Sequence, residues 1–65
     1  MQLRLSFIKE TPEARLYRNK DGKQTWIPRS VIRKTLKFPP TDDFAAPIHE
    51  IELADWWFND NEYKF

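Results

Sequence analysis

The sequence contains no cysteine and a single glycine among its 65 residues. Without cysteine, neither a disulfide nor a cysteine-ligated zinc site can form. With only one glycine, the chain cannot form a glycine-rich phosphate loop. No apolar run approaches the ~20 residues that a membrane-spanning helix needs, and the first residues lack the apolar block of a signal peptide. We therefore expect a cytoplasmic protein with no membrane partner.

Aromatic residues, by contrast, are abundant: three Trp, two Tyr and five Phe. A chain of this length forms one domain at most, here residues 1–65, and such a small domain buries only about 60% of the surface that its unfolded chain exposes. Each buried ring removes roughly 150–250 Å² from water. The rings therefore either hold a small core together or supply an interface.

Alternating apolar and polar residues predict five short strands. Asp21-Gly22 between two such runs predicts a hairpin turn, and Gly22 suits a position of positive φ. Pro28-Arg29-Ser30 ends the third run and predicts a single tight turn, because proline has no amide proton to donate to a sheet. The expected strands are residues 2–7, 14–18, 23–27, 32–38 and 49–53.

In the fourth expected strand, the alternation places the apolar residues and one lysine on the same face: Ile32, Lys34, Leu36 and Phe38. The opposite face then carries basic residues that can pair with acidic residues of the fifth strand. Each such pair contributes only about 0.2–1 kcal/mol. The expected pairs join Arg33 and Lys37 to Glu50 and Glu52.

The C-terminal residues predict a short helix. Asp55 is a good N-cap residue, and a helix from Trp56 places Leu53, Trp56 and Trp57 near one stripe. The polar tail, residues 59–65, is expected to fray. Before this region, the composition of residues 39–47 predicts a loop, with Phe44 as a plug and the carboxylates of Asp42 and Asp43 in solvent.

These elements predict a mostly β fold: a small five-stranded antiparallel sheet, or an SH3-like barrel, with a short C-terminal helical segment. The barrel alternative rests on the pattern Ile27-Pro28-x-Ser30-x-Ile32. It resembles the late segment of SH3-like barrels, where an apolar-Pro-Ser turn leads into the last strand. That likeness covers only about seven residues and concerns shape alone.

A wider resemblance involves three segments, residues 14–17, 26–32 and 51–57. Together they resemble a group of small phage and prophage proteins with a Trp-Ile-Pro-basic-Ser-x-Ile core and an Ile-x-apolar-x-acid-Trp segment near the end. This chain departs from that pattern in the 39–47 loop and in its last six residues. The resemblance implies a mobile-element origin, and hence the cytoplasm of a host cell, but it implies no chemistry.

The residue inventory offers little for catalysis. Ser30, His49 and Asp42 could make up a triad, but one glycine and so short a chain leave little backbone for an oxyanion hole and a pocket. A metal site drawn from Asp42, Asp43, His49 and Glu50 lacks the spacing of a calcium loop. We expect a protein that is not an enzyme and has no cofactor, with Ser30 in its turn and His49 at a strand end.

Charge is divided between the two halves of the chain. Residues 1–38 hold ten basic and three acidic residues, whereas residues 39–65 hold one basic and seven acidic residues. Basic residues interleaved with rings in a small barrel are typical of single-strand binding. The nucleic-acid-binding candidates are Arg15, Tyr17, Arg18, Lys20, Lys23 and Arg29. In the alternative interpretation the two halves pair with each other, and Trp26 is a core residue.

The acidic half offers a protein-binding candidate instead. Three consecutive rings, Trp56, Trp57 and Phe58, cannot all face one core, so at least one should be exposed or in an interface. Asp55 and Tyr63 belong to the same candidate site. The partner is either a second copy of the chain or another protein. The alternative is that a terminal helix packs two of these rings as core on an open barrel end.

The first functional hypothesis is therefore a small non-enzymatic binding protein of a phage or mobile element. Its partner would be a host or phage protein of nucleic-acid processing or host defence. The second hypothesis is direct binding of single-stranded nucleic acid by the basic N-terminal half.

Overall fold

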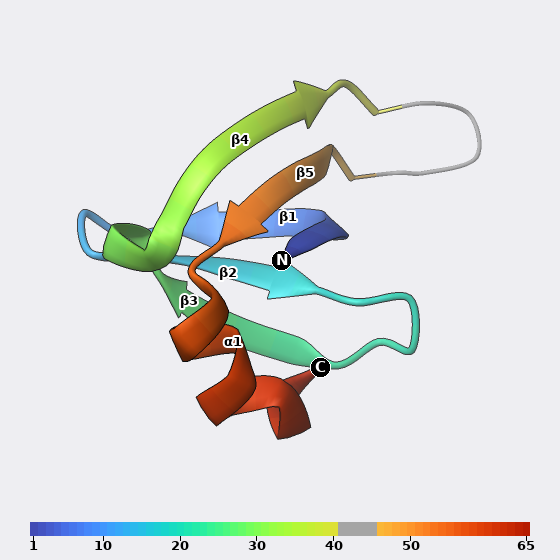
Figure 1. Ribbon diagram of the computed structural model, residues 1–65. Helices are drawn as coiled ribbons and strands as arrows, with labels where there is room; N and C mark the ends of the chain where they lie inside the picture. The colour runs from blue at the N-terminus through green and yellow to red at the C-terminus, as the bar shows by residue number, and fades with distance from the viewer. Residues whose placement is uncertain (41–45) are drawn as a thin grey trace.

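The computed structural model describes residues 1–40 and 46–65. Five strands form one antiparallel sheet in the order β3-β2-β1-β5-β4 (Figure 1). In chain order the elements are β1 (Gln2–Glu10), β2 (Ala14–Arg18), β3 (Gln24–Pro28), η1 (Arg29–Val31), β4 (Ile32–Phe38), β5 (Ile48–Leu53), α1 (Asp55–Asn61) and η2 (Glu62–Lys64). The mostly β fold with a short C-terminal helix is thereby confirmed. Within these ranges no ladder joins β3 to β4, so the sheet is open.

The expected 39–47 loop is described only at its two ends. Pro39 and Pro40 follow β4, and Ala46 and Pro47 precede β5. The placements expected for Asp42, Asp43 and Phe44 lie outside the described residues.

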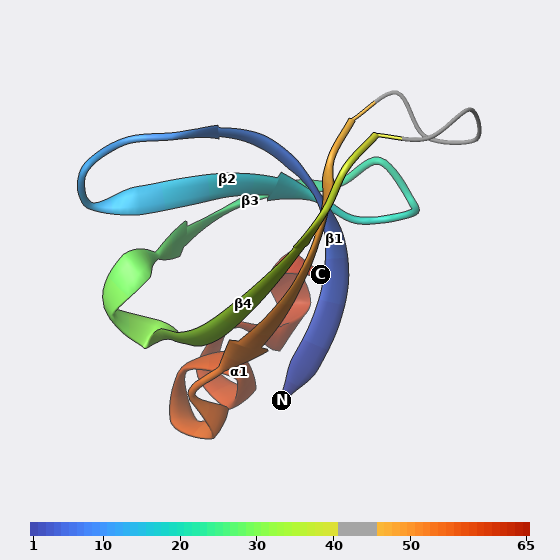
Figure 2. The same ribbon diagram turned by 90° about the horizontal axis from the view of Figure 1, so that it is seen from above.

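The central strand β1 belongs to both halves of the sheet. Its N-terminal half pairs with β5 as far as Ser6, and from Ser6 onward it pairs with β2 through a ladder that has a bulge between Phe7 and Lys9. Bulges bend and twist a strand. Figure 2 shows the two halves of the sheet diverging from β1. At the left of that view, away from β1, η1 (green) joins β3 to β4.

The two predicted turns form where the sequence places them. The Asn19 side chain accepts hydrogen bonds from the amides of Asp21 and Lys23, at 3.0 and 2.9 Å. Gly22 has a φ of +86°, which explains the glycine. Beyond β3, η1 follows Pro28, as expected from the Pro28-Arg29-Ser30 turn.

The core lies between the inner face of the sheet, η1 and α1. Its buried members are Leu5, Tyr17, Ile27, Val31, Ile51, Leu53, Ala54 and Trp57. Trp26 is not among them, because its side chain lies on the other face of β3 and is 43% exposed, whereas the neighbouring Ile27 is fully buried. The expectation that Trp26 is a core residue is therefore wrong.

The expected faces of β4 are also reversed. A register shift between Ile32 and Lys34 interrupts the alternation. After it, Leu36 and Phe38 point outward and are 49% and 41% exposed, while the half-buried Thr35 lies opposite the core residue Ile51. The expected charge pairs fail for the same reason. Lys34 lies opposite Glu52, Lys37 lies opposite His49, and the ion pair of Glu50 is with Arg4, at 3.6 Å.

The C-terminal residues pack more closely than expected. Ala54, not Asp55, is the N-cap of α1, and Asp55 begins the first turn. The predicted tail continues the helix and then forms η2, and Phe65 packs against the core. The Thr25 hydroxyl donates a hydrogen bond to the Lys64 carbonyl at 2.6 Å, which attaches the end of this tail to β3.

Candidate binding surface on the outer face of the sheet

Backbone pairing decides which side chains share a face, because residues opposite each other on neighbouring strands point to the same side. One row of paired residues crosses all five strands on the side away from the core: Phe38, Ile48, Ser6, Arg18 and Gln24. A shorter row beside it crosses three strands: Lys9, Leu16 and Trp26. We call this side the outer face.

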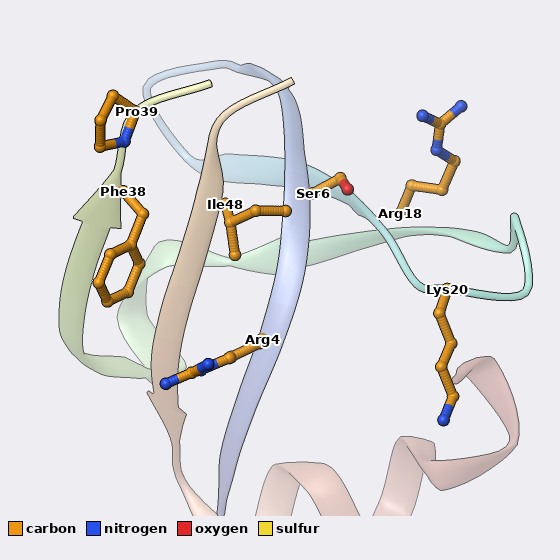
Figure 3. Close-up of a pocket in the computed structure, with 7 residues that line it drawn as sticks. All are labelled: Arg4, Ser6, Arg18, Lys20, Phe38, Pro39 and Ile48. Carbon is orange, nitrogen blue, oxygen red and sulfur yellow. The ribbon is translucent and has the colours of Figure 1, made fainter. Parts of the chain in front are cut away.

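A hollow of about 410 Å³ opens on the outer face, and we call it the basic groove. Its lining residues come from β1, β2, β5, the β2–β3 turn, and the end of β4 with the residue after it: Arg4, Ser6, Arg18, Lys20, Phe38, Pro39 and Ile48. Figure 3 shows Phe38 and Ile48 on one side of Ser6, with Arg18 and Lys20 on the other. The basic groove therefore combines an apolar side with a cationic side.

Among the described residues, all charged side chains that line the basic groove are positive. The Arg4 guanidinium lies 5.7 Å from the centre of the Phe38 ring, within the range of a cation–π contact. Glu50 offsets part of the Arg4 charge from 3.6 Å. Among the ion pairs formed by residues 1–40 and 46–65, none involves Arg18 or Lys20. Arrangements of this kind favour anionic ligands that carry a flat apolar group.

A second hollow, of about 430 Å³, lies on the inner side of the same strand end. Here Tyr17 Oη is 2.8 Å from His49 Nδ1, and Arg15 Nη1 donates to the Tyr17 hydroxyl at 3.4 Å. Burial, and then the positive charges of Arg15 and Lys37, lower the pKa of His49 below its usual 6.5. Burial also raises the pKa of Tyr17. Because Glu10 lines this hollow too, its charge is mixed.

The six nucleic-acid-binding candidates separate into three groups. Arg18 and Lys20 line the basic groove. Tyr17 is only 1% exposed and the Arg15 side chain only 12%, so both belong to the inner network instead. Lys23 donates to the Tyr63 carbonyl at 2.7 Å, and Arg29 lies 3.8 Å from Glu10.

Sequence reasoning missed Arg4 and Phe38. Phe38 was assigned to the core face of β4, and Arg4 was counted only among the ten basic residues of 1–38. The position of Phe38 directly before Pro39 and Pro40 was the available signal in the sequence, but the side on which its ring lies depends on the register shift in β4.

The five protein-binding candidates do not form one patch. Trp57 is buried and Phe58 packs against the core, whereas Trp56 is 61% exposed, as expected for at least one of the three rings. Trp56 and Asp55 line a hollow with Glu52 and Arg33. The hydrogen bond from the terminal amino group, at 2.9 Å, lowers the pKa of Asp55. Tyr63, 72% exposed, lines a different hollow beside β3.

Two of the residues considered for catalysis, Ser30 and His49, lie in different elements. Ser30 is exposed in η1, and His49 is buried against Tyr17. Asp42, the third member of the considered triad, lies outside the described residues. In the described part of the chain, no group of three or more His, Asp or Glu side chains is placed to hold a metal ion. Nor does any helix there have the length and apolar character to cross a membrane.

The chain gives no match to any protein-family model, and no significant match to a curated protein or to a solved structure.

Proposed function

We propose that the protein is a non-enzymatic binding protein and that its basic groove binds single-stranded nucleic acid. The observation that carries this proposal is the position of Phe38. Its ring is 41% exposed, has the Arg4 guanidinium beside it, and shares a groove with Arg18 and Lys20.

The groove suits a nucleotide because the two parts of the ligand need different surroundings. An unpaired base stacks on the Phe38 ring, a contact that contributes about 1–3 kcal/mol per base and does not depend on the base. The phosphates on either side of that base lie against Arg4, Arg18 and Lys20. In a duplex the faces of the bases are already stacked, so the ring has nothing to bind.

The test compares two exposed apolar residues of β4. Phe38→Ala removes the ring from the basic groove, whereas Leu36→Ala removes a side chain of similar exposure on the same face but outside that groove. Binding is measured by fluorescence anisotropy with labelled single-stranded DNA and RNA of about 10 nucleotides at about 50 mM salt. We expect Phe38→Ala to weaken binding about 5- to 150-fold, and Leu36→Ala to leave it nearly unchanged.

Two results contradict the proposal. One is the absence of single-strand binding by the wild-type protein at this salt concentration. The other is an equal loss for Phe38→Ala and Leu36→Ala, because a general change in the sheet, and not stacking, would then account for the effect. A duplex of the same sequence serves as the ligand control.

A second candidate function is protein binding through α1, and the 61% exposure of Trp56 favours it. Together with the resemblance to phage and prophage proteins, it suggests a host or phage protein of nucleic-acid processing or defence, in the host cytoplasm, or a second copy of the chain. Exposed tryptophans are frequent anchors of protein interfaces.

The test of this second function contrasts Trp56 with its buried neighbour Trp57. Trp56→Ala should weaken association by about 2 kcal/mol or more and preserve the fold, whereas Trp57→Ala should unfold the domain. Light scattering reports self-association, and partner titration reports other proteins. Unchanged association in Trp56→Ala would exclude this role for Trp56.

A further inference from the structure

A second exposed ring lies on the outer face, at the opposite edge of the sheet. Trp26 of β3 is 43% exposed, and Lys9 Nζ lies 5.8 Å from the centre of its ring. The arrangement repeats that of Phe38 and Arg4, at 5.7 Å. Each edge of the outer face therefore presents an aromatic ring with a cation beside it.

Trp26 also lines a hollow of about 370 Å³, which we call the tryptophan hollow. Its lining residues are Lys23, Gln24, Thr25, Trp26, Tyr63 and Lys64. As in the basic groove, every charged lining residue in the described part of the chain is positive. Lys64 Nζ lies 5.8 Å from the centre of the Tyr63 ring, so the hollow offers two rings and two ammonium groups.

The absence of carboxylates distinguishes these two sites from three other hollows in the described part of the chain. Glu10 lines the inner hollow, Glu50 and Glu52 line one beside Leu36, and Glu52 and Asp55 line the one at Trp56. At these three sites the carboxylates offset the neighbouring cations and so weaken the attraction for a phosphate. The charge of the lining residues thus selects the basic groove and the tryptophan hollow for the same kind of ligand.

The two selected sites are joined along one row of the sheet. Arg18 lines the basic groove, and its partner Gln24 on β3 lines the tryptophan hollow. The row from Phe38 to Gln24 crosses four strand spacings, or about 19 Å at roughly 4.8 Å each. A strand with a rise of about 3.4 Å per nucleotide covers this span with about six nucleotides, and a stretched strand needs fewer.

We infer that the tryptophan hollow is a second nucleotide-binding subsite, so that one single strand crosses the outer face from β4 to β3. This inference rests on the proposed function. Phe38 and Trp26 each stack a base, Arg18 holds the phosphates between them, and Lys9, Lys23 and Lys64 hold those at the far end. Strands too short to cover both rings bind only one subsite.

The experiment is a length series. Anisotropy titrations with single strands of about 3 to 10 nucleotides should show affinity rising at least ten-fold and levelling off near six, when both rings are covered. Trp26→Leu keeps an apolar side chain beside Leu16 but removes the ring. This variant should still bind strands of about 3 nucleotides at the basic groove, and lose the gain in affinity at greater lengths. Trp26→Tyr should recover most of the gain in affinity with length, because it restores an aromatic ring.

Trp56→Leu is the matched control, because it removes an exposed tryptophan that lies beside carboxylates. It should leave the affinity for single strands of every length unchanged. Circular dichroism confirms the fold of each variant. If Phe38→Ala weakens binding at every length but Trp26→Leu matches the wild type throughout, the second subsite is wrong and the proposed function stands. If the wild type binds no strand of any length, both are wrong.

Discussion

The Tyr17 hydroxyl lies 2.8 Å from His49 Nδ1, so a buried contact joins β2 to β5 across the inner face of the sheet. The Phe7 ring stacks on His49 with 4.6 Å between ring centres, and Arg15 reaches from β2 to the Thr35 hydroxyl on β4 at 3.0 Å. These contacts hold the two diverging halves of the sheet together. They thereby fix the position of Phe38, on β4, relative to Arg18, on β2.

Tyr17→Phe tests how much this contact stabilises the fold. The substitution keeps the ring but leaves His49 Nδ1 buried without its partner, which should lower the free energy of unfolding by about 1–3 kcal/mol. Urea denaturation measures the change. Tyr63→Phe, at a 72% exposed position, should stay within about 0.5 kcal/mol of the wild type. Equal stability of the two variants would contradict a structural role for the Tyr17–His49 contact.

Stability should fall in mild acid because of His49. Its pKa is lowered in the folded state from 6.5, so below about pH 6.5 the unfolded chain binds a proton that the folded chain does not. Stability from this group is therefore fully present above that pH and is lost as the pH falls through the folded-state value. Denaturation midpoints between pH 8 and pH 5 measure the effect. His49→Gln should flatten this part of the profile, and an equally steep profile in that variant would assign the loss to other groups.

Two adjacent residues of β3, Trp26 and Ile27, should differ sharply in how much they contribute to the stability of the fold. Ile27 is fully buried, so Ile27→Ala should cost about 2–5 kcal/mol. Trp26→Ala removes a larger side chain but one that is 43% exposed on the outer face, and should cost about 1 kcal/mol. Thermal melts of both variants check the order. If Trp26→Ala lost more stability than Ile27→Ala, the Trp26 ring would have to be part of the core, and it could not belong to the binding surface.

Local signals in the sequence were sufficient for the elements that depend on a few neighbouring residues. Asp21-Gly22 predicted the β2–β3 hairpin because the turn needs a positive φ, and Pro28 predicted the end of β3 and the turn after it. The outward position of Phe38 was beyond such signals. It follows from the register shift between Ile32 and Lys34, which depends on how β4 pairs with β5 and not on the alternation within β4.

The candidate site could be predicted only where its residues are close in sequence. Arg18 and Lys20 were identified because they belong to one basic run. Arg4 and Phe38 join them through the β1–β5 and β4–β5 ladders, whose register single-sequence patterns do not reveal. Tyr17 was misassigned because both faces of β2 are buried: Leu16 is 7% exposed and Tyr17 only 1%. Alternation alone does not show which of the two faces the core.

The most direct test of the account is the salt dependence of single-strand binding, measured for the wild type and two charge variants. Arg18→Gln removes a cation of the basic groove, and Lys34→Gln removes one on the same face of the sheet but beside Glu52. Each phosphate contact contributes about −0.7 to the slope of log K against log salt for single strands. We expect a slope of about −2 or steeper for the wild type, a slope about 0.7 shallower for Arg18→Gln, and the wild-type slope for Lys34→Gln. No measurable binding at low salt, or the same slope in all three proteins, would contradict the assignment of the basic groove to nucleic acid.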